Sequence, residues 1–155
     1  MSPELLQTLF DVNQRVLHRT LNGLTHEDSL IQPPVGGNCL NWVLGHVVAT
    51  RGGLLNLLGE KPIWSDDDEI LYKRGSRPIQ DGSKAKPLHS ILADYDRSQE
   101  RLRAGISRLS ESAMKEKRGE DTLGESLHFL HFHEAYHIGQ MAILRRMAGK
   151  EGAIP

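Results

Sequence analysis

The chain has 155 residues, of which 38% are hydrophobic and 25% are charged, values that suit a globular protein and exclude a disordered or fibrous one. Nineteen Lys and Arg residues face twenty Asp and Glu residues, and no segment concentrates positive charge, so nucleic acid is not an expected partner. This length predicts a single domain that spans residues 1–155.

Neither a secretory signal nor a membrane span is evident from the sequence. The N-terminal residues lack a basic segment followed by an apolar one, and no run reaches the ~18 apolar residues of a spanning helix. Cys39 is the only cysteine, so no internal disulfide is possible and a reducing compartment is indicated. We therefore expect a cytoplasmic protein in which Cys39 is a small packed residue.

Two helices are predicted in the first part of the chain. Ser2-Pro3-Glu4 has the form of an N-cap, a first-turn proline and an early acid, and apolar residues follow at helical spacing until Asn22-Gly23. A second helix follows the breaker-rich segment 32–37, with Asn38 as its expected N-cap and Gly59 as its end.

The segment 60–87 shows no sustained period and contains three prolines. Connections in helical bundles usually have about two to eight residues, so this length indicates a crossover that lets the flanking helices run parallel. A third helix is predicted over about 88–109, and a fourth from the capping box of Thr122 and Glu125 to Gly149. The sequence therefore predicts an all-α fold, a four-helix bundle with a long crossover between helices two and three.

The fourth helix contains four of the eight histidines, and they form two pairs. At about 100° per residue, His133 and His137 lie only ~40° apart on one face of the helix. His128 and His131 point roughly 170° away from that pair, which places them at the surface or its margin. The two pairs therefore cannot serve one site.

The direction of His133 and His137 falls between two apolar stripes of the same helix. One stripe consists of Leu123, Leu127, Leu130, Met141, Leu144 and Ala148, and the other of Phe129, Tyr136, Ile143 and Met147. We therefore expect both imidazoles to point into the bundle. Buried ring nitrogens need partners, and a metal ion is one such partner.

His46 provides a third inward imidazole, because it lies on the second helix between Val43 and Val47. Three imidazoles from two helices would hold a divalent metal and leave a coordination position open for water. The metal ligands predicted are therefore His46, His133 and His137. The alternative for each of them is a hydrogen-bonded core histidine.

Several residues near these histidines have two possible roles. Gln140 either holds a ligand ring or forms a helix–helix hydrogen bond. Arg51 either approaches an anionic substrate at the mouth of a cavity or forms a surface salt bridge. Trp42 is expected in the core or on a dimer face. Tyr136 is expected to pack and Glu134 to form an interhelical or solvent contact, and the alternative for both is a proton donor or acceptor that reaches the pocket.

Two segments resemble the DinB-like metal-binding proteins: Asn41-Trp42-Val43-Leu44-Gly45-His46 and His133-Glu134-Ala135-Tyr136-His137-Ile138-Gly139-Gln140. The resemblance covers nearly the whole chain and implies a four-helix bundle with a long crossover, a metal triad of the same three histidines, nickel or zinc as the metal, and a homodimer. Related sulfoxide synthases have Glu two residues after the last histidine. Gly139 stands at that position here, which counts against an iron oxygenase.

The better understood relatives of this kind transfer or isomerise adducts of low-molecular-weight thiols such as bacillithiol or mycothiol, and others are described as hydrolases. The resemblance therefore implies a metal-dependent enzyme that acts on a small molecule, either as a hydrolase or as a thiol transferase. The alternatives are a non-catalytic metal-binding or stress-response protein and an interaction bundle with a vestigial site. The sequence specifies neither the substrate nor the metal.

Overall fold

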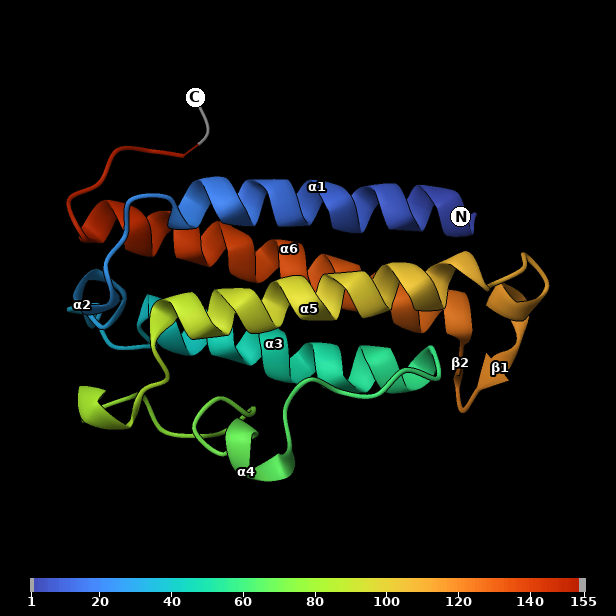
Figure 1. Ribbon diagram of the computed structural model, residues 1–155, viewed down its shortest axis with the longest axis horizontal. Helices are drawn as coiled ribbons and strands as arrows, with labels where there is room; N and C mark the ends of the chain where they lie inside the picture. The colour runs from blue at the N-terminus through green and yellow to red at the C-terminus, as the bar shows by residue number, and fades with distance from the viewer. Residues whose placement is uncertain (1, 154–155) are drawn as a thin grey trace.

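The computed structural model describes residues 2–153, and its long helices pack side by side as a bundle (Figure 1). These helices are α1 (Pro3–Leu21), α3 (Leu40–Leu57), α5 (Leu88–Ser107) and α6 (Leu123–Met147). α3 packs against α5 and α6, and α1 packs against the same two helices. The predicted all-α four-helix bundle is confirmed.

The crossover also has the predicted effect on helix direction. In Figure 1, α3 and α5 run in one direction, and α1 and α6 run in the other. The crossover contains the short helix α4 (Asp66–Glu69) and the 3-10 turn η1 (Gly82–Lys84), and it lies on the side of α3 away from α1 (Figure 1). Tyr72 and Trp64 of this segment are buried against α3 and form part of the core.

The remaining elements are short. Helix α2 (His26–Ser29) follows α1, and the 3-10 turn η2 (Ala113–Lys115) follows α5. Strands β1 (Lys117–Arg118) and β2 (Asp121–Thr122) form an antiparallel hairpin just before α6. The sequence did not predict this hairpin, because strands of two residues are too short to show an alternating pattern.

The helix caps agree with the sequence at two of three starts. Ser2 accepts a hydrogen bond from the Leu5 amide, and Thr122 and Glu125 form the predicted capping box. At α3 the prediction is wrong: Cys39 is the N-cap and makes no capping hydrogen bond, and the Asn38 amide oxygen is buried without a partner among the described residues. Because Cys39 is fully buried, packing sets the start of this helix in place of a side-chain cap.

Only one of the two apolar stripes predicted on α6 faces the core. Leu123, Leu127 and Met141 are buried, whereas Phe129, Tyr136 and Ile143 are 61%, 56% and 64% exposed. Of the two stripes that flank His133 and His137, the second is therefore exposed. A helix in this bundle contacts only its neighbours on one side, so the outward part of α6 stays uncovered. Across residues 2–153, none of the helices has the length and apolar character needed to cross a membrane.

A close approach between α3 and the crossover depends on glycine. Tyr72 packs directly on Gly45, and a Cβ atom added at Gly45 would lie 2.6 Å from Tyr72 Cγ. Gly53, two turns further along α3, has nothing within 4 Å of the same added atom. The two glycines therefore form a matched pair on one helix.

We predict that Gly45→Ala lowers the free energy of unfolding by about 1–3 kcal/mol, because overpacking displaces the Tyr72 ring. Gly53→Ala should raise it by up to about 1 kcal/mol, because alanine favours an exposed helix interior. Urea denaturation followed by circular dichroism measures both changes. Equal effects of the two substitutions would contradict the packing described for Tyr72.

Candidate metal centre

Three histidines from two helices converge inside the bundle. His46 comes from α3, and His133 and His137 come from consecutive turns of α6. One nitrogen of each ring lies within 4.8 Å of the corresponding atoms of the other two, and Nε2 of His133 lies 3.1 Å from Nε2 of His137. His46 and His137 are buried, and His133 is half-buried. The structure thus brings together all three residues that the sequence singled out.

Two of the three rings are oriented by oxygen acceptors behind them. Nδ1 of His46 lies 2.8 Å from the carbonyl oxygen of Tyr72, and Nδ1 of His137 lies 2.7 Å from Oε1 of Gln140. Because these oxygens accept, each Nδ1 carries the proton and donates it, so the lone pair of each ring is on Nε2. Of its two proposed roles, Gln140 therefore has the one that holds a histidine ring.

The crossover also holds His46 indirectly, through the Trp42 side chain of α3. The Trp42 ring stacks on His46 with a centroid distance of 4.9 Å and an interplanar angle of 11°. Trp42 Nε1 donates to the Ser76 hydroxyl at 2.9 Å. Sequence reasoning missed Tyr72 and Ser76, since they lie in a segment without a period or motif.

Burial also sets the charge state of the cluster. Removal from water lowers the pKa of His46 and of His133, and it lowers the pKa of His137 to about 4. The neighbouring histidines add to this effect for His133 and His137, because adjacent positive charges repel. All three imidazoles are therefore neutral at physiological pH, which is the form that binds metals.

The donor set of the cluster is compatible with a divalent transition metal. Two imidazole nitrogens bound to one ion at the usual ~2.0–2.1 Å lie about 3.0–3.4 Å apart, and the His133 and His137 Nε2 atoms already have such a separation. Among residues 2–153, no carboxylate or thiolate joins the three histidines in this cluster. Imidazole nitrogens suit zinc, nickel, copper or iron better than magnesium or calcium.

The other histidines of α6 lie outside this cluster, as predicted. His128 is exposed, and His131 is half-buried with its ring edge-on to Phe10 of α1 at a centroid distance of 5.3 Å. Tyr136 is exposed, so the expectation that it packs in the interior is wrong. Its hydroxyl accepts a hydrogen bond from Nε2 of Gln140 at 3.1 Å, which links it to the His137 ring.

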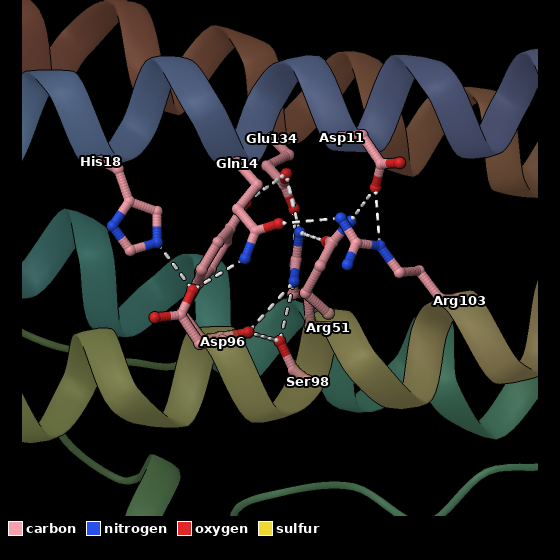
Figure 2. Close-up of polar contacts among 10 residues, drawn as sticks. Asp11, Gln14, His18, Arg51, Asp96, Ser98, Arg103 and Glu134 are labelled. Carbon is pink, nitrogen blue, oxygen red and sulfur yellow. Dashed lines mark hydrogen bonds and ion pairs between the residues drawn. The ribbon is translucent and has the colours of Figure 1, made fainter.

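Arg51 of α3 and Glu134 of α6 form a buried ion pair (Figure 2). Arg51 Nε lies 2.7 Å from Oε2 of Glu134 and Nη2 lies 3.0 Å from Oε1, and the two side chains are only 2% and 4% exposed. Both roles expected for Arg51, at the surface or at a cavity mouth, are therefore wrong. Glu134 makes the interhelical contact that was one of its predicted roles.

α5 completes the hydrogen bonding of this pair. Arg51 donates to the Ser98 hydroxyl at 2.8 Å and to Oε1 of Gln99 at 2.7 Å, and the Tyr95 hydroxyl donates to Glu134 at 3.0 Å. Burial and the Glu134 carboxylate raise the pKa of Tyr95 well above its ordinary value, so the phenol keeps its proton. Gln99 in turn donates to Asp11 of α1, so the network joins all four long helices (Figure 2).

The fold and the three-histidine cluster together define a four-helix bundle with a potential metal centre between α3 and α6. Residues 9–141 match the DinB superfamily, and the chain therefore belongs to that superfamily. A crystal structure described as a conserved protein of a locus from Enterococcus faecalis has a TM-score of 0.77 with this chain at 15% identity, over 97% of this chain and 99% of that one. This likeness shows a shared fold. A search of curated proteins found no match.

We predict that Arg51→Met lowers the free energy of unfolding by about 3–5 kcal/mol, because it leaves the Glu134 carboxylate buried without its partner. The double variant Arg51→Met/Glu134→Leu should be clearly more stable than the single one, since it removes both charges. Urea denaturation of the two variants and the wild type measures this difference. A double variant no more stable than Arg51→Met would show that the buried charge is not the cause.

Proposed function

We propose that this protein binds one divalent transition metal through His46, His133 and His137, with nickel or zinc as the metal. The observation that carries the proposal is the convergence of three neutral imidazoles whose donor nitrogens lie within 4.8 Å of one another. The acceptors behind His46 and His137 support it, because ligating histidines usually donate their second ring proton to an oxygen.

We further propose that the protein is a metal-dependent enzyme that acts on a small molecule. Catalytic metal sites commonly have three protein ligands and an open position, and the cluster offers three donors among the described residues. When bound, such an ion would lower the pKa of a water or thiol in the open position. The residues of the chain orient the ligand rings and exclude water from one side, through Tyr72, Gln140 and Trp42.

Hydrolysis and transfer of a low-molecular-weight thiol are the two reactions proposed, because both require the same open position on a metal. A homodimer is part of the proposal, supported by Phe129 and Phe132, which lie three residues apart on α6 and are 61% and 60% exposed. The near-neutral formal charge of −1 supports a small-molecule substrate over nucleic acid.

We expect about one nickel, zinc or other transition ion per chain in protein purified without an affinity tag or chelator. Alanine substitution of His46, His133 or His137 should abolish binding, whereas His128→Ala on the same helix should leave it unchanged, because His128 lies outside the cluster. Elemental analysis by mass spectrometry checks each variant. Protein that neither contains nor takes up a metal would contradict the proposal.

Enzymatic activity needs a separate test on metal-loaded protein. Ester and amide substrates report on hydrolysis, and a thiol with an electrophilic acceptor reports on thiol transfer. Activity should disappear on chelation, return with the metal, and be absent from the alanine variants of the three histidines. Stoichiometric metal without turnover in either assay would contradict the proposed enzymatic activity and leave the proposed metal binding in place.

We predict that the metal stays bound at about pH 5.5, where ordinary imidazoles with a pKa near 6.5 are mostly protonated. Protons displace a metal only when they bind the imidazoles, and burial lowers the pKa of all three, that of His137 to about 4. Binding should therefore weaken as the pH falls towards that value. Equilibrium dialysis at stepwise pH measures retention, and circular dichroism confirms that the protein is folded. Release centred at or above pH 6.5 would contradict this prediction.

A further inference from the structure

A groove of about 510 Å³ lies beside His137, between the segment 33–38 and the second half of α6. Its size falls within the roughly 300–1,000 Å³ of small-molecule pockets. His137 is the one member of the histidine cluster that lines the groove, so the groove adjoins the proposed metal centre. Its apolar walls are formed mainly by Val35, Trp42, Val43, Ile143, Leu144 and Met147.

The polar side chains that line this groove offer no ion partner to a charged ligand. Among the described residues that line it, none is Lys, Arg, Asp or Glu. Gln140 uses its amide oxygen for His137 and its amide nitrogen for the Tyr136 hydroxyl. Asn38 also lines the groove, and its buried amide oxygen, which has no partner among the described residues, is an uncharged acceptor. A charged group in this groove would lose water without gaining an ion partner, which is costly.

We propose that this groove binds an uncharged, mainly apolar part of the substrate and directs its polar end to the metal at His137. This inference rests on the proposed function and specifies its substrate class. Ile143 and Val35 are 64% and 95% exposed at the groove, so a ligand seated there would cover apolar surface that is in contact with water. Apolar contact supplies the affinity, and the metal fixes the orientation.

A second groove supports the competing hypothesis of an anionic substrate. It has a volume of about 480 Å³, lies along the crossover, and is lined by the basic residues Lys73, Arg74, Arg77 and Lys84. None of the three clustered histidines lines it. A ligand in the apolar groove contacts His137 directly, and this proximity favours the apolar groove as the substrate site.

The test uses metal-loaded protein and a series of hydroxamates, which share one metal-binding head. Acetohydroxamate reports on the metal alone, and hexanohydroxamate and octanohydroxamate add an apolar chain. The monohydroxamate of octanedioic acid has a comparable chain with a terminal carboxylate. Isothermal titration calorimetry should show affinity rising about threefold per methylene group, and the carboxylate compound should bind at least tenfold more weakly than octanohydroxamate.

Two matched variants assign this effect to the groove. Ile143→Glu places a charge in it and should weaken octanohydroxamate at least tenfold while leaving acetohydroxamate within twofold of the wild type. Ile70→Glu is the control, because Ile70 is 52% exposed but lies in the crossover, outside this groove. It should leave both affinities unchanged.

Other outcomes separate this inference from the proposed function. Acetohydroxamate binding without any gain from chain length, or stronger binding of the carboxylate compound, would overturn the groove assignment and leave the metal site intact. Wild-type dimers that Ile143→Glu converts to monomers would make the groove an interface between copies and also overturn it. If no metal binds, the proposed function fails, and octanamide, which lacks the metal-binding head, then tests the groove. Changes in the methyl NMR shifts of Ile143 and Met147 would support an apolar ligand site in the groove. Unchanged shifts would overturn the groove assignment.

Discussion

The buried ion pair of Arg51 and Glu134 is the constraint on which the rest of the structure depends. A buried pair of this kind adds little net stability compared with apolar residues, but either charge alone is strongly destabilising in the core. Arrangements of α3 and α6 that separate the two groups are therefore excluded. Because Glu134 directly follows His133, the contact with Arg51 also sets the rotation of α6 that turns His133 and His137 towards His46.

The crossover is the second part of the structure that forms the site. Tyr72 reaches α3 only because Gly45 has no side chain, and its carbonyl oxygen then accepts from the neighbouring His46. Ser76 binds the Trp42 indole, whose ring stacks on the same histidine. A segment without any helical period thus orients one of the three imidazoles, and changes in its packing would be transmitted to that ring.

The cluster has two different sides, and this asymmetry supports the proposal of an enzyme over that of a non-catalytic metal-binding protein. On one side, the ion pair of Arg51 and Glu134 lies buried between α3 and α6, and Ser98 and Gln99 of α5 accept further hydrogen bonds from Arg51. On the other side, His137 borders a groove with apolar walls that is open to water. A structural metal site needs no such opening, whereas a small molecule must reach the metal of an enzyme.

The sequence by itself determined the features that depend on neighbours along one helix. The capping box at Thr122, the order of the four helices and the common face of His133 and His137 all follow from spacings of a few residues. Only the tertiary structure decided which apolar stripe of α6 is buried and that the Arg51 guanidinium pairs with Glu134 in the core. The reason is physical: Arg51 and Glu134 are 83 residues apart, and His46 and Tyr72 are 26 apart, so no local period records these contacts.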